Sequence, residues 1–546
     1  MNKISYSVAG QVVLLNENKI VSARINIENG KIKEIVADAN APKHFILPGF
    51  VDSHIHIESS MLVPSEFARM AVKHGTVATV SDPHEIANVL GIEGVEYMLD
   101  NAKKVPFKFY FGAPSCVPAT AFETAGANLG PSDIQTLLEK EEIVFLAEMM
   151  NFPGVLHNDP EVIEKLNIAK KLNKVIDGHA PGLRGEDAKN YIDKGITTDH
   201  ECVSYDEGKE KIEFGMKVLI REGSAAKNFD ALIDLLKLYP DSVMFCSDDK
   251  HPHDLIHGHI NLLAKRAVEK GLNIFNVLKA AILNPIKHYT LEVGLLEVGD
   301  PADFIIVDDL ENFNVSKTYI DGQLVYSDGE TSIERQSFST PNNFTRTEIN
   351  ESDIKFFGKS GNYRVIEVLD GQLVTHEHLH HIESDVDGMV NSIVEDDILK
   401  MVVASRYDQS DPALAFTKGY GLKRGAIASS VAHDSHNIIA VGTNDKDLLK
   451  AINLLIKNKG GIALVDNDLE DYIALPVAGL MSTLSGEELA IRYQKLYEES
   501  KNLGSRLYDP FMMLSFCALL VIPELKLSDK GLFDVINFTF ANQIKN

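Results

Sequence analysis

The sequence predicts an α/β protein whose main unit is a (β/α)8 TIM-type barrel, with a small β-sandwich domain from the flanking segments and a C-terminal α+β domain. Three observations lead to this prediction. Eight short apolar runs alternate with longer helical stretches, strand-like hairpins lie on both sides of them, and a mixed region follows a polar linker. Such alternation is typical of βα units, and eight units over about 240 residues match a closed barrel.

Each of the eight apolar runs ends in a polar, glycine or proline turn, as barrel strands do. The first two are FILPGFVDSHIH and TVATVSDP. The runs occupy residues 45–56, 76–83, 107–118, 142–151, 173–182, 196–204, 217–226 and 242–252. The functional groups of such barrels come from the carboxyl ends of the strands, so these ends are where chemistry is expected.

The flanking segments alternate apolar and polar residues between glycine and asparagine turns, at 5–36 and again at 298–329. We expect these pieces to pair, which gives a β domain of residues 1–48 plus 291–335 and a barrel of residues 49–290. A polar stretch after Gly329 predicts a linker, and residues 350–546 then form the C-terminal domain. One of its helices is expected at KDLLKAINLLIKNKG, where apolar residues recur every three or four positions.

Charge and cysteine content limit the partners and the compartment. The 546 residues include 53 basic and 79 acidic side chains, a net charge of −26. That balance disfavours nucleic acids and anionic membranes, which bind through Lys and Arg, but it is compatible with a small neutral metabolite. Four cysteines without paired spacing, no export signal and no apolar run of about 20 residues favour a cytoplasmic protein.

Histidines and carboxylates gather at the ends of the predicted strands. His54 and His56 lie two residues apart on the first strand, so their side chains share one face. The fourth, fifth, sixth and eighth strand ends supply Glu148, His179, His200, and Asp248 with Asp249. This mixture of imidazoles and carboxylates is the ligand set of Zn, Mn or Fe, and a carboxylate can bridge two ions. A single histidine is more often structural, but six ligands at one rim predict a metal site.

The motifs PGFVDSHIHIESS and NPIKHYTLEVGLLEVGDPADFIIVD resemble the amidohydrolase superfamily. The blocks SDPHEIANVLG, LAEMMNFPGV, DGHAPGL, TTDHE, CSDDKHP and GAIASSVAHDSHNIIAVG are similar to its bacterial-type adenine deaminases over essentially the whole chain. The resemblance implies a metal-dependent barrel with two divalent ions, Mn or Fe first and Zn as an alternative. It also implies hydrolysis of adenine to hypoxanthine and ammonia, a reaction of purine salvage.

The resemblance also implies a role for each ligand by position: one ion is held by His54, His56 and Asp248, the other by His179 and His200, and Glu148 bridges them. Many members of the superfamily use a carboxylated lysine at the fourth strand, so the glutamate here favours the deaminase branch. Metal-activated hydroxide is expected to attack C6 of adenine. Asp248 would pass the proton to the departing amine, which makes Asp248 and Glu148 the catalytic candidates. Asp249 remains an alternative to Asp248 as the ligand.

Selectivity for a purine is expected from hydrogen bonds to the ring edge, because unpaired buried groups reject the wrong base. The substrate-binding candidates follow successive strands: His84, Glu85, Ser115, Asn151, Arg184 and Glu201. Other interpretations are that Glu85 only begins a helix, that Arg184 pairs with a loop carboxylate, and that Asn151 orients Glu148.

Other histidine motifs are open to more than one interpretation. HEHLH at 376–380 matches a zinc-protease pattern, but it lies in a strand-like run, where a solvated hairpin edge is favoured. The chain has no P-C-x-x-C, which excludes the small zinc nucleoside deaminases. His433 and His436 lie on a turn that either covers the barrel mouth or forms a subunit interface.

The sequence therefore predicts a cytoplasmic enzyme that takes adenine as its small-molecule substrate and forms a homo-oligomer, most simply a dimer. Two alternatives stay open. One is a related amidohydrolase that acts on a cyclic amide, and the other is a catalytically inactive homologue that only binds metal. No ligand position is visibly lost, which disfavours the second.

Overall fold

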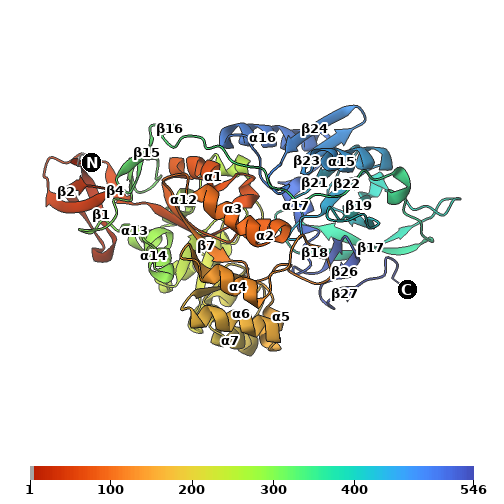
Figure 1. Ribbon diagram of the computed structural model, residues 1–546, viewed down its shortest axis with the longest axis horizontal. Helices are drawn as coiled ribbons and strands as arrows, with labels where there is room; N and C mark the ends of the chain where they lie inside the picture. Colours follow the sequence, from red (N-terminus) through yellow and green to blue (C-terminus); the bar gives the residue numbers. More distant parts are fainter. Residues whose placement is uncertain (1–4, 546) are drawn as a thin grey trace.

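The computed structural model describes residues 5–545. Figure 1 shows an elongated molecule in which an N-terminal β-sheet, a central barrel with its helices and a C-terminal mixed domain follow one another. The chain returns to the first sheet after the barrel and then crosses to the opposite end. This path places the C-terminal domain over one end of the barrel.

All eight predicted barrel strands are present, each inside its predicted run. They are β5 (Phe50–Ile55), β6 (Thr76–Ser81), β7 (Lys108–Ala113), β8 (Ile143–Met149), β9 (Val175–Gly178), β10 (Thr198–Asp199), β11 (Lys217–Arg221) and β12 (Val243–Cys246). Parallel pairing runs from β5 to β9 and from β10 to β12. The two arcs join where the Thr197 N–H donates to the Ile176 carbonyl at 2.9 Å and the Asp248 N–H donates to the His54 carbonyl at 3.0 Å. The predicted barrel is thus confirmed. The contact between the ends of β12 and β5 closes it and places Asp248 beside His54.

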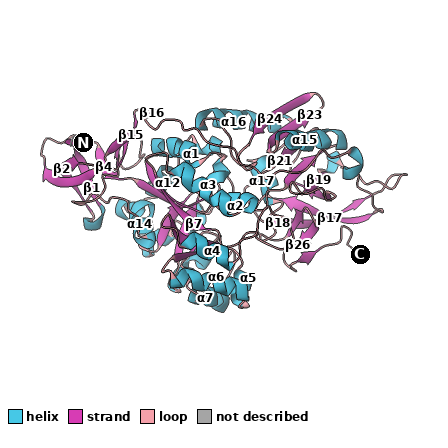
Figure 2. Ribbon diagram, in the orientation of Figure 1, coloured by secondary structure: helices cyan, strands magenta, loops and turns pink. Residues whose placement is uncertain are grey.

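The barrel strands are buried on both faces, as near-continuous apolar runs predict, and Figure 2 shows helices around them. The helix boundaries follow local signals. Asp159 accepts hydrogen bonds from the Glu161 and Val162 N–H groups, and Pro160 occupies the first turn of its helix. The barrel helices are α1 (Pro64–Ala71), α2 (His84–Leu90), α3 (Ile92–Ala102), α4 (Pro131–Leu138), α5 (Phe152–Leu156), α6 (Pro160–Lys171), α7 (Gly185–Asp193), α8 (Tyr205–Glu213), α9 (Phe229–Leu232), α10 (Leu235–Leu238), α11 (Pro252–Leu255), α12 (Ile260–Glu269), α13 (Ile274–Leu278) and α14 (Asn284–Tyr289).

The segments that flank the barrel form one eight-stranded sheet. Its strands are β1 (Ser5–Leu14), β2 (Lys19–Glu28), β3 (Lys31–Ala37) and β4 (Phe45–Pro48), and then β13 (Phe304–Val307), β14 (Val315–Ile320), β15 (Gln323–Ser327) and β16 (Glu330–Thr331). Antiparallel pairing of β4 with β13 joins the early and late pieces, as expected. Tyr6 of β1 stacks on Tyr319 of β14 with ring centroids 6.1 Å apart. The sheet therefore curls so that its two halves face each other.

The C-terminal domain contains a second eight-stranded sheet, ordered β18-β17-β20-β19-β22-β21-β23-β24, and a three-stranded sheet, β25-β26-β27. The larger sheet comprises β17 (Gly361–Val368), β18 (Thr375–Ile382), β19 (Leu399–Ala404), β20 (Ala413–Lys418), β21 (Ala426–Ser429), β22 (Ile438–Gly442), β23 (Gly461–Asp466) and β24 (Leu469–Ala474). The remaining elements are β25 (Leu525–Ser528), β26 (Gly531–Asp534), β27 (Thr539–Phe540), α15 (Asp445–Asn458), α16 (Gly486–Asn502) and α17 (Pro510–Phe516). The predicted amphipathic helix is α15, which packs Leu448, Ile452 and Leu455 against the sheet.

The HEHLH motif lies in β18, an edge strand of the larger sheet, so the strand interpretation is confirmed. His376 faces Glu524 at 3.2 Å, and His380 faces Asp396 at 3.3 Å. The two histidines thus pair with different carboxylates. Within residues 5–545, none of the helices combines the length and the apolar character that a bilayer crossing requires.

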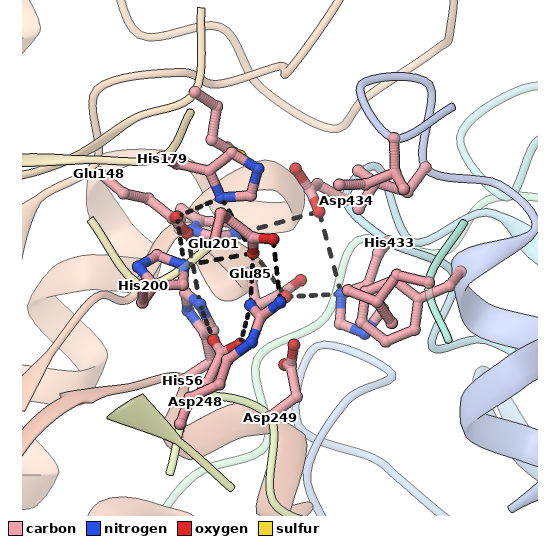
Figure 3. A pocket seen from close by; sticks show the side chains of 17 residues that line it. His56, Glu85, Glu148, His179, His200, Glu201, Asp248, Asp249, His433 and Asp434 are labelled. Carbon is pink, nitrogen blue, oxygen red and sulfur yellow. Dashed lines mark hydrogen bonds and ion pairs between the residues drawn. The ribbon is translucent and has the colours of Figure 1, made fainter. Parts of the chain in front are cut away.

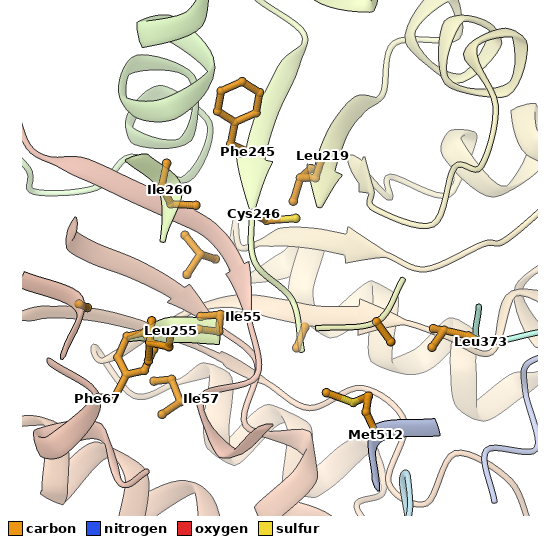
Figure 4. Packing of buried hydrophobic residues seen from close by; sticks show 14 of the residues in the cluster. Ile55, Ile57, Phe67, Leu219, Phe245, Cys246, Leu255, Ile260, Leu373 and Met512 are labelled. Carbon is orange, nitrogen blue, oxygen red and sulfur yellow. The ribbon is translucent and has the colours of Figure 1, made fainter. Parts of the chain in front are cut away.

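A shared core fixes the C-terminal domain to the barrel. Figure 4 shows Ile55 and Phe245 of the barrel in one apolar cluster with Leu373 and Met512 of the C-terminal domain. A buried polar contact reinforces this packing, since His251 Nδ1 lies 2.7 Å from an Asp509 carboxylate oxygen. The barrel mouth is therefore closed by the C-terminal domain, and the cavity between them is lined by both.

Candidate active site

The six predicted metal ligands lie together at the carboxyl ends of the barrel strands. They are buried, with no more than 6% of any residue exposed: His54, His56, Glu148, His179, His200 and Asp248. Five of them line a small cavity of about 20 Å³, whose lining is drawn in Figure 3, and His54 Nε2 lies 3.3 Å from His56 Nε2. The convergence expected from the strand ends is therefore present in the structure.

One group of ligands surrounds Asp248. His54 Nε2 lies 3.5 Å and His56 Nε2 lies 3.2 Å from the same oxygen, Asp248 Oδ1, and the two nitrogens are 3.3 Å apart. Asp248 follows β12 with a φ of 53°, in the left-handed region that residues other than glycine seldom adopt. Asp249 points elsewhere, since its Oδ1 accepts a hydrogen bond from Ser59 Oγ. Of the two adjacent carboxylates, Asp248 is thus the one that faces the imidazoles of β5.

The second group surrounds Glu148, which is buried in β8, one residue before the strand ends. Glu148 Oε2 lies 2.8 Å from His179 Nδ1 and 3.2 Å from His200 Nε2. The other oxygen, Glu148 Oε1, lies 3.3 Å from His56 Nε2. The two oxygens of one carboxylate therefore face the two histidine groups, which is the arrangement that a bridging ligand requires.

The donor atoms fit a divalent cation better than a closed hydrogen-bond network. His56 Nδ1 donates to the Asp82 carbonyl at 3.1 Å, which leaves Nε2 directed into the cluster. His179 Nε2 is buried without any hydrogen-bond partner among the described residues. Unshared imidazole nitrogens beside ionised carboxylates are the ligands that Zn, Mn and Fe bind.

Electrostatics keep the two ligand carboxylates charged. Burial alone would raise the pKa of Glu148, but His179 and His200 hold it well below the ordinary value. Burial would also raise the pKa of Asp248, but the charge of Arg221 holds it well below the ordinary value. The pKa of Asp249 is raised instead, by burial and by the charge of Asp248. Glu148 and Asp248 are therefore ionised at neutral pH and suited to bind a cation.

A buried arginine at the end of β11 links the site together. Arg221 Nη1 donates to Asp248 Oδ2 at 2.7 Å, and Arg221 Nη2 donates to Glu201 Oε2 at 2.9 Å. Burial alone would lower the pKa of Arg221, but Glu201 and Asp248 raise it. The guanidinium thus stays charged and fixes one oxygen of Asp248.

A network of buried hydrogen bonds next to the cluster joins the ends of β5 and β12. Asp52 is fully buried; its Oδ1 accepts from the Ser247 N–H at 3.0 Å, and its Oδ2 lies 2.8 Å from His259 Nε2. His259 Nδ1 in turn lies 2.7 Å from Thr76 Oγ1. Asp52 is two residues before His54, and Ser247 directly precedes Asp248. The network therefore fixes both strand ends that carry ligands.

The predicted substrate residues divide into two sets. His84, Glu85 and Glu201 line the metal cavity. Ser115 and Asn151 do not: Ser115 Oγ donates to the Glu148 carbonyl at 2.5 Å, and Asn151 Oδ1 accepts from the Gly154 N–H at 2.9 Å.

Arg184 also lies outside the cavity. Its side chain is 46% exposed and forms an ion pair with Glu210 of α8. The chain leaves the fifth strand through a turn that places Arg184 at the start of α7, on the surface. The structure therefore gives Arg184 a surface salt bridge of the kind considered as its alternative role.

The C-terminal domain supplies cavity residues that strand-end reasoning did not find. His433 and Asp434 line the cavity, together with apolar residues from three segments: Leu373, Phe516, Leu519 and Ile522. His433 Nδ1 lies 2.6 Å from Glu85 Oε1, and His436 contacts the other Glu85 oxygen. The HDSH turn thus covers the barrel mouth, which was one of its two expected places. Its two histidines were the available signal, whereas the apolar residues carried none.

Comparisons with known proteins agree with this architecture. The amidohydrolase family model matches residues 45–325, and the model of the adenine deaminase C-terminal domain matches residues 372–539. An adenine deaminase of Methanosarcina mazei is 54% identical over 533 residues, which cover 95% of this chain and 96% of that protein. An adenine deaminase of Borreliella burgdorferi is 49% identical over 546 residues, which cover 98% of this chain and 99% of that protein. A solved beta-aspartyl dipeptidase from Fervidobacterium islandicum AW-1 covers 62% of this chain and 100% of its own, at 14% identity and a TM-score of 0.46.

Proposed function

The chain belongs to the adenine deaminases of the amidohydrolase family, and from its site we propose that it hydrolyses adenine to hypoxanthine and ammonia at the barrel mouth. The nearly full-length identity with proteins of that name supports the substrate. The buried cluster of imidazoles and carboxylates supports hydrolysis assisted by metal.

The cofactor of this proposal is a pair of divalent ions. One would be held by His54, His56 and Asp248, the other by His179 and His200, with Glu148 between them. Mn and Fe are proposed first and Zn as the alternative, because all three accept imidazole and carboxylate ligands. When bound, such ions lower the pKa of a coordinated water toward neutrality and so supply the nucleophile that C6 of adenine needs.

Asp248 is proposed to move the proton. Arg221 occupies its Oδ2 at 2.7 Å, while Oδ1 faces the histidines of β5. Because Arg221 binds only Oδ2, Oδ1 of this carboxylate is left to accept a proton from the attacking water. It then delivers that proton to the amine that leaves C6. Glu201 holds Arg221 from the other side and so keeps Asp248 in place.

Recognition of the purine is assigned to the remaining cavity residues. His84, Glu85 and Glu201 line the cavity and are proposed to face the ring edge, with Glu85 already held by His433 and Glu201 by Arg221. Phe516 and Leu519 of the C-terminal domain provide apolar walls for a flat ring and exclude water. Ser115, Asn151 and Arg184 are not assigned to this role, since they lie outside the cavity.

The observation that supports the proposal most directly is the position of Glu148, whose two oxygens face separate histidine groups. The test is to purify the protein, measure its metal content, and follow adenine absorbance together with ammonia release. We expect a metal-containing protein that converts adenine. A metal-containing protein that opens a cyclic amide and leaves adenine unchanged would refute the assignment, as would a metal-containing protein with no hydrolase activity.

Association into a dimer and a cytoplasmic location remain predictions from the sequence. Size-exclusion chromatography with light scattering measures the first directly. We expect twice the mass of one chain, and a monomer at working concentration would contradict the prediction.

A further inference from the structure

A second hollow lies beside the metal cavity, between barrel loops and the C-terminal domain. Its volume is about 450 Å³, and it is lined by the loops after β7 and β8, by α6, and by Val521, Pro523, Val535 and Phe538 of the C-terminal domain. Met150 lines both this hollow and the metal cavity. Two other hollows, next to the N-terminal sheet and its junction with the barrel, share no lining residue with the metal cavity. The second hollow is therefore separated from the metal site by the thickness of a side chain.

The metal cavity itself is small, at about 20 Å³, compared with the second hollow. Its ligands are almost fully buried, and its outer wall consists of Phe516, Leu519 and Ile522 from the C-terminal domain. These residues belong to the core that fixes the domain over the barrel. A base that reacts at the metals needs a passage to reach them. Met150 lies in the wall that the metal cavity shares with the second hollow.

We propose that this hollow is an antechamber, which binds free adenine before the base passes Met150 into the metal cavity. The inference rests on the proposed function and adds a second binding site to it. The lining suits an uncharged flat heterocycle, because it includes the aromatic rings of Phe122, Phe152 and Phe538. Lys165 Nζ is tied to the Ser115 carbonyl at 3.1 Å and to Glu161 at 2.9 Å, so its charge is already paired.

Met150 has the properties of a movable partition. Its backbone is fixed, since its N–H donates to the Glu148 carbonyl at 3.1 Å and its carbonyl accepts from the Phe152 N–H at 2.8 Å. Its side chain is unbranched and has three rotatable bonds, so it can change rotamer inside a packed wall. Ser115 and Asn151, both expected from the sequence to contact substrate, line the antechamber together with Met150.

The chain contains no tryptophan, so a single introduced indole reports on its own surroundings. Phe538→Trp places a reporter in the antechamber at a position that is 49% exposed, with one aromatic ring replacing another. Phe357→Trp is the matched control, because Phe357 is 63% exposed and does not line the hollow. Both variants are stripped of metal with a chelator, so that adenine is not consumed, and are titrated with adenine. We expect saturable quenching from Phe538→Trp and none from Phe357→Trp.

A kinetic arm tests passage separately from binding. Ala119 lines the antechamber and is partly exposed, so Ala119→Phe narrows the hollow without touching the metal ligands. We expect kcat/KM for adenine to fall about tenfold with metal content unchanged, whereas Ala119→Ser keeps the wild-type value. The antechamber proposal would be overturned, and the proposed function kept, if the enzyme deaminates adenine but Phe538→Trp gives no saturable signal. Equal signals from both reporters would have the same meaning. A wild-type protein that does not deaminate adenine would instead remove the proposed function.

Discussion

Replacing Glu148 with glutamine changes a carboxylate that faces both histidine groups while keeping its shape. Oε2 lies 2.8 Å from His179 and 3.2 Å from His200, and Oε1 lies 3.3 Å from His56. The substitution removes the negative charge and turns one oxygen into an amide donor that points at imidazole nitrogens. Both proposed ions lose a ligand at once.

The size of the effect follows from the position of Glu148 in the cluster. Removing a group that only orients a ligand already lowers metal affinity by about ten- to hundredfold. Loss of a direct ligand is therefore expected to cost at least about 100-fold for each ion, or about 2.7 kcal/mol. Adenine turnover should fall with the metal content, because the nucleophile depends on it.

The assay is elemental analysis of the desalted protein together with the rate of ammonia release from adenine. Glu141→Gln is the matched control, since Glu141 is exposed just before β8 and faces no ligand. We expect it to retain wild-type metal and activity. His179→Asn is expected to weaken one ion more than the other. If Glu148→Gln lost a single ion and kept the second at wild-type affinity, the bridging assignment would be wrong.

Three further predictions concern residues outside the ligand set. His433→Ala should retain metal but lower adenine turnover about ten- to hundredfold, because the buried Glu85 carboxylate loses the imidazole that lies 2.6 Å from it. Wild-type turnover in this variant would show that the turn carrying His433 is not part of the site. Asp509→Ala should lower the free energy of unfolding in urea by about 3 to 5 kcal/mol, because it breaks the buried pair that joins the C-terminal domain to the barrel; an unchanged free energy would contradict this. Burial lowers the pKa of Lys526 from 10.5 to about 8. Between pH 8 and pH 10.5, Lys526 therefore carries a proton in the unfolded chain that it has lost in the folded chain. The free energy of unfolding of the wild type, relative to that of Lys526→Met, should therefore rise by about 3 kcal/mol from pH 8 to pH 10.5. If the difference between the two proteins in urea unfolding did not change with pH, the lowered pKa of Lys526 would be refuted.

The barrel could be predicted from the sequence because its strands are buried on both faces and end in punctuating turns. The run at 45–56 contains β5, and its alternation places His54 and His56 toward one volume. Closure of a cylinder then brings distant strand ends together without any knowledge of side-chain contacts. This is why Glu148 and His200, far apart in sequence, could be expected at one site.

Side chains in the loops beyond the strands could not be placed in this way. Alternation fixes side-chain direction only within a strand, so Arg184, six residues after Gly178, was expected at the substrate but lies on the surface. Arg221 was overlooked although it ends β11, where a charged residue was a usable signal. Phe516 and Leu519 carried no signal at all, because an apolar helix end looks the same whether it fills a core or lines a cavity. Their role depends on how two domains dock, which local patterns do not encode.

The central claim is that buried imidazoles and carboxylates at the barrel mouth bind the divalent metal on which adenine hydrolysis depends. The most direct measurement follows ammonia release from adenine by the purified protein, before chelation, after chelation, and after Mn, Fe or Zn is returned. We predict that activity is lost with the metal and restored in proportion to the ions that rebind. Full adenine turnover by a protein shown to contain no divalent metal would contradict the account.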